Sequence, residues 1–83
     1  MWYVYLARCS DNSLYCGITN NLEKREKAHN SGKGSKYTRS RLPVEFVWFE
    51  IHETKGEALS RESQIKKKKK KEKESLLVDK DYR

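Results

Sequence analysis

Tyrosine side chains gather on one face of the hairpin predicted at the N-terminus. Residue alternation along the two strands places Tyr3, Tyr5 and Tyr15 on the same face as Gly17. Gly17 carries no side chain, so we expect that a ligand backbone can approach the sheet closely there. Tyr3 by itself is typical of a half-buried strand residue, because strands favour tyrosine. Tyr5 and Tyr15 with Gly17 fit that ordinary role and a concave polar patch equally well.

Two polar residues occupy one stripe of the first predicted helix. Leu22, Arg25 and His29 share a face at spacings i, i+3 and i+7, where apolar residues are usual. Arg25 fits a solvated surface charge as well as a site residue. His29 equally fits a helix-end histidine that bonds nearby carbonyl groups. The pattern alone leaves both interpretations open.

A single acid lies on the inner stripe of the second predicted helix. Ala58, Glu62 and Ile65 share a face with Leu59. In the ordinary interpretation Glu62 pairs with Lys66 at i, i+4, which contributes only a few tenths of a kcal/mol. In the functional interpretation Glu62 binds a metal, because Mg²⁺ takes one or two carboxylates and completes its shell with water and phosphate. One inward glutamate fits a one-metal site better than a two-metal clamp.

The net charge of +7 and the pI of about 9.5 predict a polyanionic partner, more often nucleic acid than an anionic membrane surface. Residues 8–41 carry eight basic and three acidic side chains, and so do residues 61–74. Residues 45–57 carry four glutamates and one lysine, so an acidic stretch separates two basic ones.

We expect the basic segment 31–41 to be a flexible loop that grips a phosphate backbone, with Tyr37 stacked on a base. The lysines of 66–71 point all round a helix, so most are solvated and some contact phosphate. The candidate nucleic-acid-binding residues are Lys33, Lys36, Tyr37, Arg39, Arg41, Lys66 and Lys69.

These residues must be positioned by a small α+β domain. Strands are expected at 2–8, 14–19 and 44–51. The first helix is expected to run from the N-cap Asn20, with Glu23 completing a capping box, to residue 28 or 29. A second helix begins at Thr54, and a short third helix at 72–78 packs Leu76, Leu77 and Val78. The turn is 10–13. The strand at 44–51 is apolar on both alternate faces, with Val44, Phe46 and Trp48 on one and Val47, Phe49 and Ile51 on the other. This pattern predicts the middle position in the sheet.

A chain of 83 residues predicts one domain over residues 1–83 with a modest core. The start lacks a basic region and a long apolar run, so we expect no signal peptide, and no stretch is long enough to span a membrane. A disulfide between Cys9 and Cys16 is conceivable across the hairpin, but free thiols in the cytoplasm are the expectation.

The same residues resemble the GIY-YIG nucleases. The two signatures correspond to Tyr3-Val4-Tyr5 and Tyr15-Cys16-Gly17, and two helix motifs follow. The helix motifs are Leu22-x-x-Arg25-x-x-x-His29-Asn30-Ser31-Gly32 and Ala58-x-x-x-Glu62-x-x-Ile65-Lys66. The match is closest to small stand-alone bacterial members and extends from Trp2 to about Val78.

By this resemblance, the fold is a three-stranded antiparallel sheet flanked by helices, and the activity is metal-dependent hydrolysis of DNA phosphodiester bonds. Tyr5 and Tyr15 would orient and deprotonate water, Arg25 would hold the scissile phosphate, and His29 would carry a proton or contact phosphate. Glu62 would bind one divalent cation, Mg²⁺ or Mn²⁺. Branched or damaged DNA, in a DNA-repair setting, is the candidate substrate.

Two other functions remain open at this point. A non-catalytic module would bind DNA or RNA through the same basic surface, with an affinity that falls steeply with salt. A protein-interaction domain would use its lysine-rich helix to meet an acidic partner. We expect a monomer, with a protein partner as a candidate source of substrate specificity.

Overall fold

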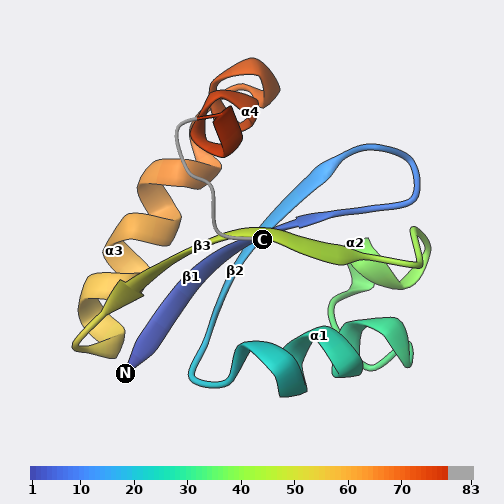
Figure 1. Ribbon diagram of the computed structural model, residues 1–83, viewed down its shortest axis with the longest axis horizontal. Helices are drawn as coiled ribbons and strands as arrows, with labels where there is room; N and C mark the ends of the chain where they lie inside the picture. The colour runs from blue at the N-terminus through green and yellow to red at the C-terminus, as the bar shows by residue number, and fades with distance from the viewer. Residues whose placement is uncertain (79–83) are drawn as a thin grey trace.

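The computed structural model describes residues 1–78, which form a three-stranded antiparallel sheet with helices on both faces (Figure 1). The order along the chain is β1 (Trp2–Arg8), β2 (Leu14–Thr19), α1 (Leu22–Asn30), α2 (Lys36–Arg39), β3 (Glu45–His52), α3 (Lys55–Lys66) and α4 (Lys70–Val78). The α+β class and the sheet are confirmed. In the described part of the chain, no helix is long and apolar enough to cross a membrane. The last residues of the predicted domain, 79–83, lie outside the described residues.

The strand order is β2-β1-β3, so β1 is central and β3 lies at an edge. The prediction that β3 is the middle strand was therefore wrong. Its two apolar faces have another cause, because helices cover both sides of the sheet (Figure 1).

The predicted alternation of β3 is also wrong, because a register shift against β1 between Leu6 and Ala7 adds one residue to β3. Phe46 consequently packs with Phe49, whereas Trp48 packs on the opposite face.

The hairpin of β1 and β2 has the register that residue alternation predicts. Tyr5 lies opposite Gly17, and Ala7 lies opposite Tyr15, so the odd-numbered residues share a face. The turn between the strands is stabilised by Asp11, whose carboxylate accepts a hydrogen bond from the backbone N–H of Ser13 at 3.0 Å.

Helix α1 begins one residue later than predicted. Asn21 rather than Asn20 is its N-cap, and the Asn21 side chain accepts a hydrogen bond from the backbone N–H of Lys24 at 3.0 Å. Glu23 therefore lies too early in the helix to complete a capping box. The helix ends at Asn30, slightly later than predicted, and the expected stop at Gly32 is present with a φ of +82° that glycine adopts without strain.

The segment 31–41 is not the flexible loop that we predicted. It contains α2, a single helical turn whose N-cap Ser35 forms a capping box with Thr38. The Ser35 side chain accepts from the Thr38 backbone N–H, and the Thr38 hydroxyl accepts from the Ser35 backbone N–H. This pair satisfies two N–H groups that a free loop would leave to water.

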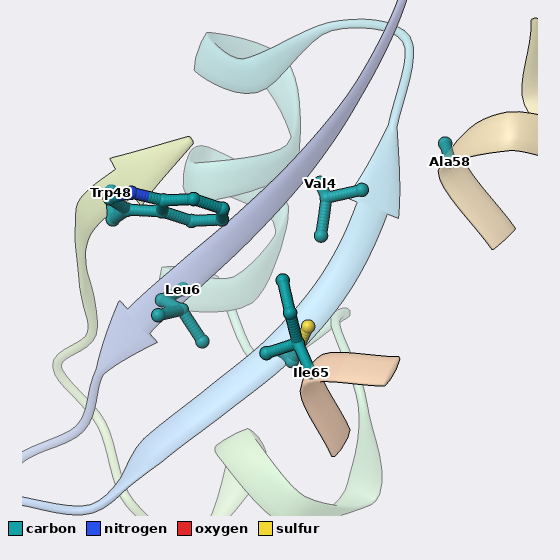
Figure 2. Packing of buried hydrophobic residues seen from close by; sticks show 6 residues of the cluster. Val4, Leu6, Trp48, Ala58 and Ile65 are labelled. Atoms are coloured by element: carbon teal, nitrogen blue, oxygen red, sulfur yellow. The ribbon is translucent and has the colours of Figure 1, made fainter. Parts of the chain in front are cut away.

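The face of the sheet under α3 is a hydrocarbon core (Figure 2). Val4 and Leu6 of β1 and Trp48 of β3 pack against Ala58 and Ile65 of α3, and each of these is fully buried. The N-cap of α3 is Thr54, as predicted. Leu59, predicted on this inner stripe, is 45% exposed because it projects from the next position around the helix.

Helix α4 covers the end of this core and begins two residues earlier than predicted. Leu76 and Leu77 pack against the core as predicted, and the side chain of Val78 lies outside the described residues. Arg8 of β1 donates two hydrogen bonds to the Glu74 carboxylate, which ties α4 to the sheet.

The two cysteines are free thiols and lie on opposite faces of the sheet. Cys16 belongs to the core under α3, whereas Cys9 packs with Tyr5 and Phe46 on the α1 side. A disulfide across the hairpin is therefore excluded by the geometry of the fold.

Candidate active site

Tyr5 occupies the centre of the sheet face that α1 and α2 cover. Its ring stacks on Phe46 with centroids 4.1 Å apart, and the whole residue is inaccessible to solvent. Its hydroxyl oxygen lies 2.9 Å from His29 Nε2 and accepts a long hydrogen bond of 3.5 Å from Arg25 Nε. Three of the predicted site residues therefore converge on one phenol oxygen.

Gly17 is required by Tyr5 and not by a ligand. A Cβ built at Gly17 would lie 2.6 Å from Cζ of the Tyr5 ring, well inside van der Waals contact. The Tyr5 side chain crosses the neighbouring strand at this point on its way to α1. The expectation that a ligand backbone approaches the sheet at Gly17 was therefore wrong, because the phenol ring fills that space.

Burial keeps the Tyr5 phenol protonated in the free protein. Loss of hydration raises the pKa of Tyr5 to about 12, and the hydrogen bond and charge of Arg25 lower it only in part. A tyrosine with this pKa is a poor base at neutral pH unless further positive charge is brought close to it.

His29 is fully buried, and both of its ring nitrogens have partners. Nε2 meets Tyr5, and Nδ1 lies 2.8 Å from the Thr38 hydroxyl. Burial first, and the charge of Arg25 second, lower the pKa of His29 to about 4. His29 is therefore a neutral hydrogen-bonding group at physiological pH and not the helix-end histidine that the sequence also allowed.

Arg25 is half-buried, and within the described residues its side chain donates one hydrogen bond, from Nε to the Tyr5 hydroxyl. It also lines a pocket of about 200 Å³ between the end of β2 and the first turns of α1. The other lining residues are Thr19, Asn20, Asn21, Lys24 and Ala28. Arg25 thus links the buried Tyr5 hydroxyl to an open, positively charged pocket. A larger surface pocket of about 590 Å³, lined by Arg8, Cys9, Glu26, Pro43, Val44 and Glu45, includes none of the predicted catalytic residues.

Tyr15 differs from Tyr5 because its ring is only half-buried. It lies at the margin of the cluster, with its ring centroid 5.6 Å from that of His29 and 6.4 Å from that of Tyr5. The Tyr15 ring also stacks with the exposed ring of Tyr37, with centroids 5.8 Å apart. Of the two signature tyrosines, Tyr15 is the one that reaches solvent.

The sequence interpretation missed Thr38 and Gly34, which surround the His29 ring. Thr38 is fully buried and bonds Nδ1, whereas a Cβ at Gly34 would lie 2.7 Å from His29 Cγ. The signal was present in Ser35-x-x-Thr38, a helix-start pattern with threonine in the third helical position. The prediction of a flexible loop over residues 31–41 did not take this pattern into account.

Glu62 does not join this cluster. It belongs to α3, which packs on the opposite face of the sheet; its side chain is 17% exposed and pairs with Lys66 at 3.3 Å, as the ordinary interpretation expects. Glu62 is close enough to the edge strand β2 to act on Cys16. Burial, and then the charge of Glu62, raise the pKa of the Cys16 thiol to about 12. Cys16 lies between Tyr15 and Gly17 in β2, and those two residues face the opposite side of the sheet, which Tyr5 shares.

The donor set around Glu62 limits the kind of cation that it can hold. Within residues 1–78, no group of three or more histidine, cysteine, aspartate or glutamate side chains could hold a metal ion together. A site built on Glu62 therefore offers one partly exposed carboxylate. That fits Mg²⁺ or Mn²⁺ bound mainly by water and substrate phosphate, and it does not fit a zinc site.

The predicted nucleic-acid-binding residues form two separate surfaces. Lys33, Lys36, Tyr37 and Arg39 are exposed around α2, on the side of Tyr15. Arg41 has a structural role, because its guanidinium donates to the Asp11 carboxylate at 2.8 Å and lies 3.9 Å from the Tyr37 ring centroid. Lys66 and Lys69 are exposed at the junction of α3 and α4, which lies away from α2 in Figure 1.

Residues 1–75 match the family model described as the GIY-YIG catalytic domain. UPF0213 protein CPE1444 of Clostridium perfringens is 58% identical over 80 residues, which cover 96% of this chain and 86% of that protein. UPF0213 protein YazA of Bacillus subtilis is 47% identical over 78 residues, which cover 94% and 79% of the two chains.

Two solved structures share the architecture. The solution NMR structure of UPF0213 protein BH0048 from Bacillus halodurans is 41% identical with a TM-score of 0.62, and the match covers 96% of this chain and 86% of that one. The solution NMR structure of EF2693 from E. faecalis is 38% identical with a TM-score of 0.62, and the match covers 98% and 90% of the two chains.

Proposed function

The chain belongs to the GIY-YIG family of nuclease domains, and from that premise we propose that it is a metal-dependent endonuclease that hydrolyses DNA phosphodiester bonds. The observation that carries this proposal is the convergence of Arg25 and His29 on the hydroxyl of the buried Tyr5. A buried phenol bonded to a neutral histidine and an arginine costs desolvation that an apolar core would avoid. Its position beside the basic pocket of Arg25 supports a role in phosphate chemistry.

In this proposal Arg25 binds the scissile phosphate. Its planar guanidinium can bond two phosphate oxygens at once, and only its Nε is engaged within the described part of the chain. The bond to Tyr5 is long at 3.5 Å, so a phosphate can draw the guanidinium outward and open the Tyr5 hydroxyl to water.

The two tyrosines then have different tasks. Tyr15 reaches solvent and orients the attacking water. Tyr5 takes a proton from that water at Oη while its own proton passes to His29 Nε2, 2.9 Å away. In the free protein this transfer is opposed, because the pKa of Tyr5 is about 12 and that of His29 about 4. The negative phosphate held by Arg25 would offset the positive charge that this transfer leaves on His29.

Glu62 would hold the divalent cation from its place beside the edge strand β2. When bound, such a cation polarises a phosphoryl oxygen and offsets the charge of the leaving group. The Glu62 carboxylate now pairs with Lys66, so the cation would have to replace Lys66 at that carboxylate. Exposed lysines and arginines around α2 and at the α3–α4 junction would hold the phosphate backbone on either side.

The test is cleavage of nicked, flapped and four-way-junction DNA with Mg²⁺, with Mn²⁺ and with chelator. Arg25→Ala and Glu62→Gln should each reduce cleavage by about 10² fold or more. Lys27→Ala on α1 and Glu57→Gln on α3 are matched controls, because both residues are exposed, and we expect them to cut normally.

Salt-sensitive binding without cleavage on any substrate would instead support a non-catalytic nucleic-acid-binding module. The pairing of Glu62 with Lys66, across the sheet from Tyr5, is the observation that favours that second function.

A further inference from the structure

A chain of buried hydrogen bonds runs from Arg25 through Tyr5 and His29 into α2. Arg25 Nε donates to Tyr5 Oη, Tyr5 Oη lies 2.9 Å from His29 Nε2, and His29 Nδ1 lies 2.8 Å from Thr38 Oγ1. The Thr38 hydroxyl in turn donates to the Ser35 carbonyl at 3.3 Å. Tyr5, His29 and Thr38 are all 0% exposed, so water cannot supply a missing partner.

The direction of these bonds follows from counting protons. A neutral imidazole carries one N–H, on Nδ1 or on Nε2. If Nε2 carried it, the Tyr5 oxygen would accept from both Arg25 and His29, and the Tyr5 hydroxyl proton would have no acceptor among the described residues. If Nδ1 carries it, Tyr5 donates to Nε2, Nδ1 donates to Thr38, and Thr38 donates to Ser35. Only the second arrangement satisfies every buried proton.

We propose that Thr38 is a positioning residue: its hydroxyl accepts the Nδ1–H of His29 and, together with the Tyr5 hydroxyl at Nε2, fixes the ring in its Nδ1–H tautomer, so that Nε2 faces Tyr5 as the acceptor of its proton. The inference rests on the proposed nuclease function for its catalytic meaning, whereas the tautomer itself is a property of the free protein. Thr38 touches no substrate in this scheme. It acts through the histidine ring, as a second hydrogen-bonding group does for many functional histidines.

The surroundings of Thr38 hold its hydroxyl in place. The two reciprocal hydrogen bonds of the capping box between Ser35 and Thr38 fix the first turn of α2. Arg41 then ties α2 to the hairpin turn, since its guanidinium bonds Asp11 at 2.8 Å and its carbonyl accepts from the Ser10 N–H at 2.9 Å. Gly34 allows the chain to pass against the imidazole ring, where a Cβ would clash. A four-residue helix with these attachments is a rigid support for one hydroxyl.

The first test reads the tautomer directly. In protein labelled with ¹⁵N at histidine, the protonated and bare ring nitrogens give well-separated shifts in long-range ¹H–¹⁵N spectra. At pH 7 we expect His29 with a protonated Nδ1 and a bare Nε2. Thr38→Val, which keeps the shape and removes the hydroxyl, leaves one buried proton without an acceptor in either tautomer, so we expect a mixture of tautomers. Thr38→Ser should restore the wild-type pattern. A wild-type protein with Nε2–H overturns the proposal, and this holds even if Thr38→Val fails to fold.

The second test asks whether the tautomer matters for cleavage. Thr38→Val should lower the single-turnover rate by about 10 to 10² fold while DNA affinity is unchanged, and Thr38→Ser should regain most of that rate. Thr54→Val is the matched control, since it removes a capping threonine hydroxyl at α3, far from His29. An unchanged tautomer and rate in Thr38→Val overturn the proposal. Absence of cleavage by wild-type protein would reject the nuclease function, and the spectra would still decide the role of Thr38.

Discussion

The two faces of the sheet use alternate residues of the same strands, but they are stabilised in different ways. Under α3, Val4, Leu6 and Trp48 form a hydrocarbon core. Under α1 and α2, Tyr5 and Phe46 stack beside a buried histidine and threonine whose polar atoms are bonded to one another. In the described residues, the one buried side-chain polar atom without a partner is Trp48 Nε1, and it lies on the hydrocarbon side.

This difference indicates that stability and chemistry are divided between the faces. Burial of apolar surface contributes about 25 cal/mol per Å² and needs no precise geometry. A buried polar chain contributes little unless every donor has an acceptor, and it then fixes one arrangement of its members. We therefore expect variants of the apolar residues under α3 to change stability most, and variants of the polar residues under α1 and α2 to change activity most.

The largest effect on stability should come from Leu6→Ala on the α3 face. The fully buried leucine leaves a cavity, and we expect a loss of about 2–5 kcal/mol in the free energy of unfolding, measured by urea denaturation. Tyr5→Phe removes one oxygen from the opposite face and leaves His29 Nε2 without its partner, which should cost about 1–3 kcal/mol, while cleavage falls by about 10² fold or more. Equal stability losses for the two variants would contradict the division between the faces.

The next effect is the dependence of stability on pH that the buried His29 contributes to the α1 face. The pKa of His29 is about 4 in the folded protein and 6.5 ordinarily, so between these values the unfolded chain binds more protons. Stability is therefore complete above pH 6.5 and falls on acidification to pH 4, by at most about 3 kcal/mol. His29→Gln should remove this component from the denaturation profile, and His52→Gln should retain it. A His29→Gln profile parallel to that of the wild type would show that the histidine is not buried neutral.

The smallest effect separates two glycines. Gly17→Ala places a methyl group against the Tyr5 ring, and we expect a loss of about 1–3 kcal/mol together with weaker cleavage. Gly56→Ala on α3 has open space, with the nearest atom, Thr54 Oγ1, at 4.0 Å, and should stabilise the protein by about 0.5–1 kcal/mol. Thermal unfolding of both variants tests this directly, and a neutral Gly17→Ala would mean that Tyr5 can move without cost.

The sequence by itself determined the elements and the face on which each hairpin residue lies. Period-two alternation placed Tyr5 and Tyr15 with Gly17, and period-3.6 spacing placed Arg25 and His29 together on α1. Both inferences needed only neighbours within one element or one hairpin. They succeeded because the side-chain directions of strands and helices repeat at fixed intervals.

Only the tertiary structure decided which of these groups touch. The bulge opposite Leu6 and Ala7 moved Phe46 under Tyr5, and strand order placed β1 rather than β3 at the centre. The packing of α2 gave His29 its second partner, Thr38, nine residues further along the chain. The tertiary structure also placed α3, the helix that carries Glu62, on the face of the sheet opposite to Tyr5. Such contacts depend on the packing of whole elements against one another, and no local period in a sequence encodes that packing.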